Sequence, residues 1–95
     1  MINRDNYVYI SSMDTELYNL EDEWVLIDKT QEKVAIMNET AFVLWECIRS
    51  VSKIKIKELY NIIKAKYKDV DRTQLEQDVN DTIDLLLKEN FIYEI

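Results

Sequence analysis

Apolar and polar residues alternate through the first part of the chain and take a helical spacing after it. The alternation over residues 7–11, 23–28 and 33–37 predicts β-strands, because successive side chains of a strand point to opposite faces of a sheet. Residues 16–20 fit either a further short strand or a loop. Residues 29–32 contain no glycine, so we expect a longer loop there than a two-residue primed turn.

The strand predicted at residues 33–37 meets the first helix without an intervening glycine or proline. We expect Asn38 to cap this helix, because an asparagine side chain accepts a hydrogen bond from a free N–H group of the first turn. The helix is predicted to end near Ser50. Its apolar residues lie on most of its sides, which is typical of a helix at the centre of a core.

Two further helices and an extended tail complete the predicted order. The second helix covers residues 56–67, and the third covers residues 71–89, where Asp71 and Gln74 resemble a capping box. Residues 90–95 form the tail. We therefore expect one α+β domain over the whole chain, with a small antiparallel three-stranded sheet followed by three α-helices. The core positions expected on the helices are Ala41, Leu44, Trp45, Ile48, Ile56, Leu59, Tyr60, Ile63, Tyr67, Leu75, Val79, Thr82, Ile83 and Leu86.

The composition argues against most classes of enzyme. The chain has no histidine, the commonest acid–base catalyst at neutral pH, and no glycine, which phosphate-binding loops need. The single cysteine, Cys47, lies among apolar residues and is expected to be a small buried side chain. A zinc site made of cysteine and histidine is excluded. We expect a protein without catalysis, cofactor or metal.

The chain has no candidate membrane segment. No stretch approaches the roughly 18 apolar residues that cross a bilayer, and the first ten residues lack the apolar core of a secretion signal. We expect a cytoplasmic protein with no membrane partner.

Two classes of binding function fit a small sheet with three helices. One is a winged-helix transcriptional regulator, in which the third helix enters the major groove of DNA. The other is a module that adds an extended peptide to a free sheet edge. The net charge of the chain is −7, and the third helix is acidic too. Residues 71–89 carry six acidic residues and only two basic ones, Arg72 and Lys88. DNA phosphates would be repelled by such a helix, so DNA binding is the weaker alternative. The lysines of residues 53–68 are expected to form a solvated helix face.

A peptide-binding module needs an unpaired strand and a neighbouring groove. The strand at residues 33–37 is the last before the helices, so we expect one of its edges to lack a partner. At about 100° per residue, Asp78, Thr82 and Leu85 fall on one shoulder of the third helix. If this shoulder overhangs the strand edge, it forms a groove with an apolar floor and a carboxylate on its rim. The alternative is that Leu85 only broadens the core face.

Three segments resemble PqqD-like proteins in their order and spacing: "MNETAFVLWECI", "KIKELYNIIKAKY" and "LEQDVNDTIDLLLKENFI". In the first, Met37 stands where leucine is usual. The resemblance covers residues 23–93. The sequence departs from the family after the first helix, where an Asp-Gly turn is common and this chain has "RSVSKIK".

The resemblance implies a winged-helix-turn-helix-like recognition element for ribosomally made natural products. In that family, the leader segment of a precursor peptide adds as a strand beside the third helix. In this chain the strand is Lys33–Met37 and the helix is residues 72–89. The bound precursor is then presented to a modifying enzyme such as a radical SAM protein, a cyclase or a leader peptidase. The residues expected to bind peptide are Lys33, Val34, Ala35, Ile36, Met37, Asp78, Thr82 and Leu85.

Within this candidate site the residues have different expected roles. The backbone of residues 33–37 supplies hydrogen bonds, whereas pockets near Val34, Ile36, Thr82 and Leu85 supply selectivity. Asp78 is a candidate partner for a basic leader residue. The chain length suggests a free-standing recognition protein, with a domain of a larger enzyme as the alternative. Pairing of the edge strand with a second copy leaves a homodimer open.

Overall fold

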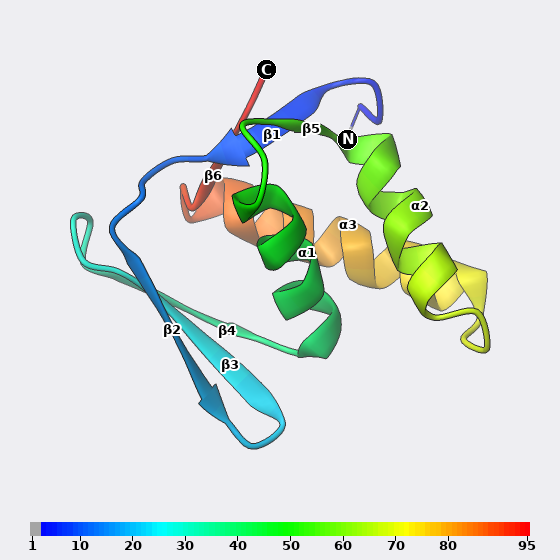
Figure 1. Cartoon of the computed structure of the whole chain (residues 1–95), viewed down its shortest axis with the longest axis horizontal. Helices are drawn as coiled ribbons and strands as arrows, with labels where there is room; N and C mark the ends of the chain where they lie inside the picture. Colours follow the sequence, from blue (N-terminus) through cyan, green and yellow to red (C-terminus); the bar gives the residue numbers. More distant parts are fainter. Residues whose placement is uncertain (1–2) are drawn as a thin grey trace.

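The structure is a computed structural model and describes residues 3–95. These residues form two small antiparallel sheets and three helices. Figure 1 shows one sheet beside the helices and the other at the end of the molecule where both termini lie. The elements are β1 Tyr7–Ile10, β2 Thr15–Leu20, β3 Glu23–Asp28, β4 Lys33–Met37, α1 Glu39–Arg49, β5 Ile54–Lys55, α2 Ile56–Lys66, α3 Arg72–Lys88 and β6 Ile92–Glu94. The predicted α+β class is confirmed.

The sheet that precedes the helices has the strand order β2-β3-β4, and residues 16–20 belong to its first strand rather than to a loop. The strand predicted at residues 7–11 lies elsewhere. It is β1, and it pairs with β5 and β6 in a second sheet of order β5-β1-β6. This second sheet was not predicted. It ties the connection between α1 and α2 to the extended tail, both through β1.

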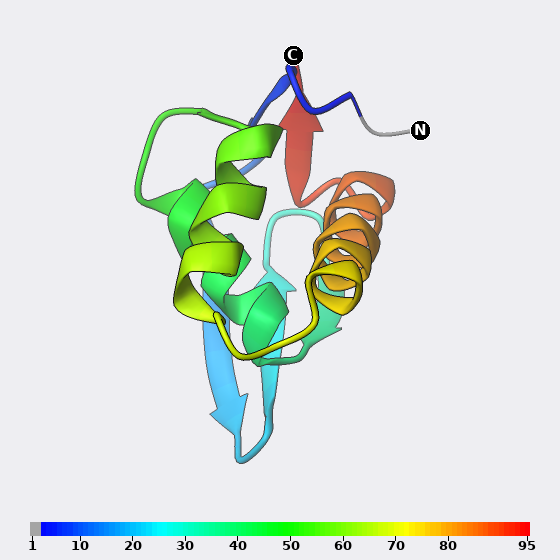
Figure 2. The same ribbon diagram turned by 90° about the vertical axis from the view of Figure 1, so that its right-hand side faces the viewer.

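The first helix is central, as its apolar residues predicted. It packs against β1, β3, β4, α2 and α3, and Figure 2 shows α1 with α2 on one side of the molecule and α3 on the other. The rings of Trp24 on β3 and Phe42 on α1 stack with their centroids 4.7 Å apart. Trp45 is fully buried and meets Phe91 edge to face. Among residues 3–95, no helix is both long and apolar enough to cross a membrane.

The predicted helix caps are confirmed at Asn38 and in part at Asp71. The Asn38 side chain accepts a hydrogen bond from the Ala41 N–H at 2.9 Å, so β4 passes directly into α1. Asp71 accepts from the Thr73 N–H at 3.2 Å. The capping box predicted with Gln74 is wrong, because the Gln74 side chain donates to the Asp78 carboxylate one turn further along α3.

The loop between β3 and β4 is held by a buried aspartate. The Asp28 side chain is fully buried and accepts from the N–H groups of Thr30 and Gln31 at 2.9 and 3.2 Å, and from the Gln31 side chain at 2.9 Å. Glu32 then takes a left-handed backbone conformation with φ of 54°, which glycine would adopt at lower cost. The prediction of a loop longer than two residues is confirmed, and this loop sets the register of β4 on β3.

The C-terminal end of α3 turns the chain back toward the core. Asn90 has φ of 58°, and the Phe91 N–H donates to the Leu86 carbonyl at 2.8 Å, the pairing of a Schellman motif. Asparagine takes the place of the usual glycine. The turn buries Phe91 and leads into β6.

Candidate functional site

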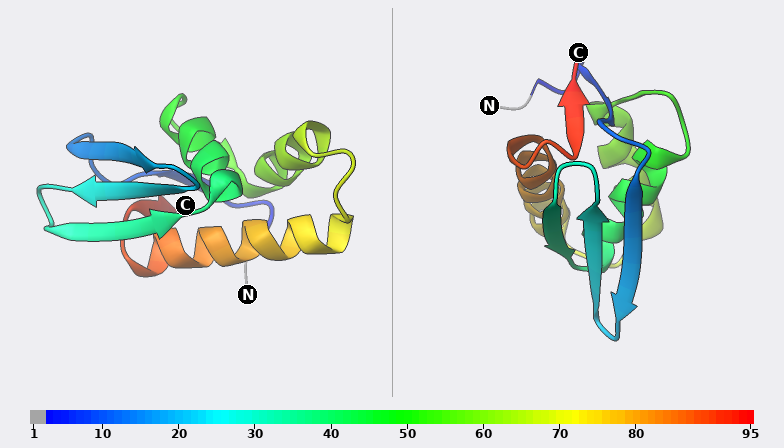
Figure 3. Two further views of the ribbon diagram at one scale, coloured as in Figure 1. Left: turned by 90° about the horizontal axis from the view of Figure 1, so that it is seen from below. Right: turned by 90° about the vertical axis from the view of Figure 1, so that its left-hand side faces the viewer.

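The strand β4 has one open edge. It pairs with β3 and with no other strand of the described chain. Figure 3 shows β4 as the strand of its sheet that lies nearest to α3. The prediction that the strand at residues 33–37 has an unpaired edge is confirmed.

The backbone groups on this open edge belong to Val34 and Ile36. Lys29, just beyond β3, donates its N–H to the Asp14 carbonyl on the β2 side at 3.1 Å. Since backbone groups alternate sides along a strand, the even-numbered residues of β3 face β4 and pair with its odd-numbered residues, such as Ala35. The N–H and C=O groups of Val34 and Ile36 therefore point away from β3.

The side chains of β4 alternate between the core and the outer face of the sheet. Ala35 and Met37 are buried against the core, whereas Val34 is 59% and Ile36 62% exposed. The register places Ile36 opposite Val25 and Val34 opposite Ile27 on the outer face of the sheet.

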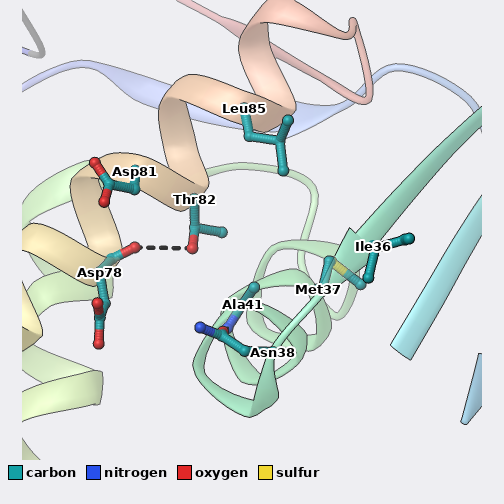
Figure 4. A pocket seen from close by; sticks show the side chains of 8 residues that line it. All are labelled: Ile36, Met37, Asn38, Ala41, Asp78, Asp81, Thr82 and Leu85. Carbon is teal, nitrogen blue, oxygen red and sulfur yellow. Dashed lines mark hydrogen bonds between the residues drawn. The ribbon is translucent and has the colours of Figure 1, made fainter. Parts of the chain in front are cut away.

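A cavity of about 160 Å³ lies between the end of β4, the start of α1 and the middle of α3. Figure 4 shows Thr82 and Leu85 of α3 on one side of it and the end of β4 with the start of α1 on the other. The Thr82 hydroxyl donates to the Asp78 carbonyl at 2.8 Å, so its methyl group is left to the cavity wall. The lining residues are Ile36, Met37, Asn38, Ala41, Asp78, Asp81, Thr82 and Leu85.

Five of the eight predicted site residues line this cavity, namely Ile36, Met37, Asp78, Thr82 and Leu85. Leu85 is 36% exposed, so it does more than broaden the core face. Val34 and Ala35 do not line the cavity. Val34 lies on the exposed outer face of the sheet, and Ala35 is in the core.

Lys33 also lies outside the cavity. Its ammonium group donates to the Glu89 carbonyl at 2.9 Å. It therefore satisfies a free carbonyl at the end of α3 and joins the start of β4 to that helix.

Three lining residues were not predicted: Asn38, Ala41 and Asp81. The first two were assigned structural roles, as helix cap and core residue, and both still have them. Their place at the cavity depends on how close the start of α1 comes to α3, which sequence spacing does not show. Asp81 follows Asp78 by three residues, so the same helical spacing would have found it.

The carboxylates at the cavity have neutral partners. Asp78 accepts from the side-chain amide of Gln74 at 2.9 Å, and Asp81 accepts from that of Gln77 at 2.8 Å. Neither carboxylate forms an ion pair with a residue of the described chain.

Other ionisable groups lie away from the cavity. The ammonium of Lys64 donates to Glu76 at 2.7 Å, and this hydrogen bond holds the pKa of Glu76 below its usual value. Cys47 was expected to be buried but is only partly buried, packed against the core. This partial burial raises the pKa of its thiol. Residues 3–95 contain no group of three His, Cys, Asp or Glu side chains placed to hold a metal ion.

Comparison with known proteins agrees with the resemblance found in the sequence. The model of a family described as coenzyme PQQ synthesis protein D (PqqD) matches residues 23–92. Among solved structures, the chain is similar to TbiB1 in complex with the TbiA(beta) leader peptide, with a TM-score of 0.65 and 21% identity over 88% of this chain and 93% of that chain. No curated protein matches the chain significantly.

The similarity to TbiB1 shows that the fold is shared. The family match adds more, because the matched residues include β4, α1 and α3, which form the cavity and the open edge. The chain belongs to the PqqD family.

Proposed function

We propose that this protein binds the leader segment of a ribosomally synthesised precursor peptide and presents it to a modifying enzyme. The leader adds as a strand to the open edge of β4 and lies against α3. The protein contributes binding and presentation, and the receiving enzyme carries out the chemistry.

One observation carries this proposal: an open strand edge lies directly beside a cavity of side-chain size. The outward N–H and C=O groups of Val34 and Ile36 offer four backbone hydrogen bonds that do not depend on the side chains of the leader. The neighbouring cavity supplies a place for a leader side chain, which is where selectivity arises in strand addition. The structurally similar TbiB1, solved with a leader peptide, supports this mode of use.

The negative charge of α3 argues against DNA binding, the alternative function. The four acidic residues within Arg72–Lys88 outnumber its two basic residues, and two of the four, Asp78 and Asp81, line the cavity. A helix of this charge in the major groove would bring more anions than cations toward the DNA phosphates.

The proposal is tested by titrating the isotope-labelled protein with synthetic leader peptides of any candidate precursor genes that neighbour its own. We expect the amide NMR signals of residues 33–37 and 75–88 to shift together as the complex forms. Shifts confined to the lysine-rich residues 53–68 would contradict leader binding at β4. Mixed duplex DNA at low salt is the matched control, and we expect no binding that weakens steeply with salt.

A further inference from the structure

The surroundings of the open edge of β4 differ in charge from one end of the strand to the other. Lys33 lies at the start of β4 and contacts the last turn of α3 through the Glu89 carbonyl. Asp78 and Asp81 lie on the α3 rim of the cavity at the opposite end, and Figure 4 shows their carboxylates turned away from Met37 and Ala41. A strand added to this edge therefore meets a cation at one end and two anions at the other.

Aliphatic side chains form much of the cavity wall between these ends. Met37 and Ala41 are buried, and Ile36 and Leu85 contribute partly exposed aliphatic groups. A protein cavity of about 150 Å³ lined by apolar residues is large enough for benzene. At about 160 Å³, this cavity takes a side chain of the size of leucine or phenylalanine.

Both carboxylates retain unused capacity to accept hydrogen bonds. Each receives one hydrogen bond, from a neutral glutamine amide on the same helix, Gln74 or Gln77. An ionised carboxylate has about four acceptor positions, and bonds to a cationic donor are stronger than bonds to an amide. The described residues supply no such cation here.

We infer that the leader segment bound at this site carries a large apolar residue with a lysine or arginine one or two positions away. The apolar side chain fills the cavity, and the cation pairs with Asp78 or Asp81. This inference rests on the proposed function and deepens it, because it states the chemistry of the leader. The basic residue of the leader then lies at the Met37 end of β4, and whether it precedes or follows the apolar residue determines the direction of the leader along the strand.

A selection from random displayed peptides tests this inference without knowledge of the natural leader. The full-length protein is used as bait, alongside Asp78→Asn, Asp81→Asn and the matched control Asp84→Asn. Asparagine keeps one oxygen that can accept from glutamine and replaces the other oxygen, together with the charge, by a neutral NH2 group. Asp84 lies on α3 toward Tyr60 of α2, where burial raises the pKa of the tyrosine and the charge of Asp84 adds to it.

The wild-type protein and Asp84→Asn should select a large apolar residue with an adjacent lysine or arginine. Asp78→Asn or Asp81→Asn should keep the apolar residue and lose part of the basic enrichment. For one selected peptide, replacing its basic residue by glutamine should weaken binding about 1.5- to 5-fold, the range of an exposed ion pair. That loss should disappear in the aspartate variant that removes the pair, and in high salt.

Two results would overturn the inference in different ways. Peptides that share the apolar residue and need the β4 edge, but carry no basic preference, would refute the charge selectivity and leave the proposed function standing. Peptides whose binding is unchanged by Val34→Pro, which removes one N–H from the β4 edge, would refute leader addition at β4 and the inference with it.

Discussion

Replacing Val34 by proline removes one backbone donor from the open edge of β4 and leaves the sheet intact. The Val34 N–H points away from β3, so its loss breaks no hydrogen bond of the β3–β4 ladder. Proline is tolerated on edge strands where its missing N–H faces solvent. The Val34 side chain is already 59% exposed, so little core packing is lost.

The expected effects on stability and on binding differ in size. The free energy of unfolding should fall only by the cost of the backbone restriction that proline imposes on residues 33 and 34, because no ladder hydrogen bond is lost. A leader strand loses one hydrogen bond, which contributes about 0.5–1.5 kcal/mol net, so its Kd should rise about 2- to 12-fold. Steric exclusion of the incoming strand by the proline ring adds to this loss.

The assay is fluorescence anisotropy with a labelled leader peptide, together with thermal unfolding of each variant. Asn19→Pro is the matched control. Asn19 on β2 lies opposite Trp24, whose backbone groups face β4. The Asn19 N–H therefore points to the outer edge of β2, which is the other open edge of the sheet. It should leave the Kd unchanged. Equal affinity of the wild type and a folded Val34→Pro variant would refute the reasoning, as would an equal loss of affinity in Asn19→Pro.

Three further predictions concern the scaffold. Asn38→Ala removes the hydrogen bond to Ala41 and should lower the free energy of unfolding in urea by about 0.5–2 kcal/mol, and an unchanged value would contradict the cap. The hydrogen bond from Lys64 lowers the pKa of Glu76 in the folded protein. The pair therefore stabilises the fold fully at a pH above the usual glutamate pKa, and this stabilisation is lost as the pH falls through the lower pKa of the folded state. Glu76→Gln should therefore have a lower Tm than the wild type at neutral pH, and this difference should vanish on acidification. Burial raises the pKa of Cys47, so iodoacetamide should alkylate it more slowly at neutral pH in the folded protein than in urea, and equal rates would contradict this.

Local signals in the sequence predicted the local parts of the fold and of the site. Asn38 and Asp71 cap helices through hydrogen bonds to residues two or three positions ahead, a range that residue type alone can predict. Helical spacing placed Asp78, Thr82 and Leu85 on one shoulder of α3, where the structure has the cavity.

The remainder depends on contacts between distant parts of the chain. Both faces of β4 are apolar in sequence, so alternation alone could not show that Ala35 and Met37 take the core side. The second sheet depends on Ile54–Lys55, a strand of two residues that is too short to show a pattern and that pairs with β1 far earlier in the chain. The approach of α1 to α3, which adds Asn38 to the cavity wall, is likewise a matter of packing.

Hydrogen exchange of individual backbone amides tests the central claim most directly. The amides of Val34 and Ile36 should exchange quickly in the free protein, because both point to the open edge of β4. Saturation with the leader peptide should slow both, while the outward amides of Leu17 and Asn19 on β2 should continue to exchange quickly. A bound leader that leaves Val34 and Ile36 exchanging as in the free protein, or that protects the β2 amides instead, would contradict strand addition at β4.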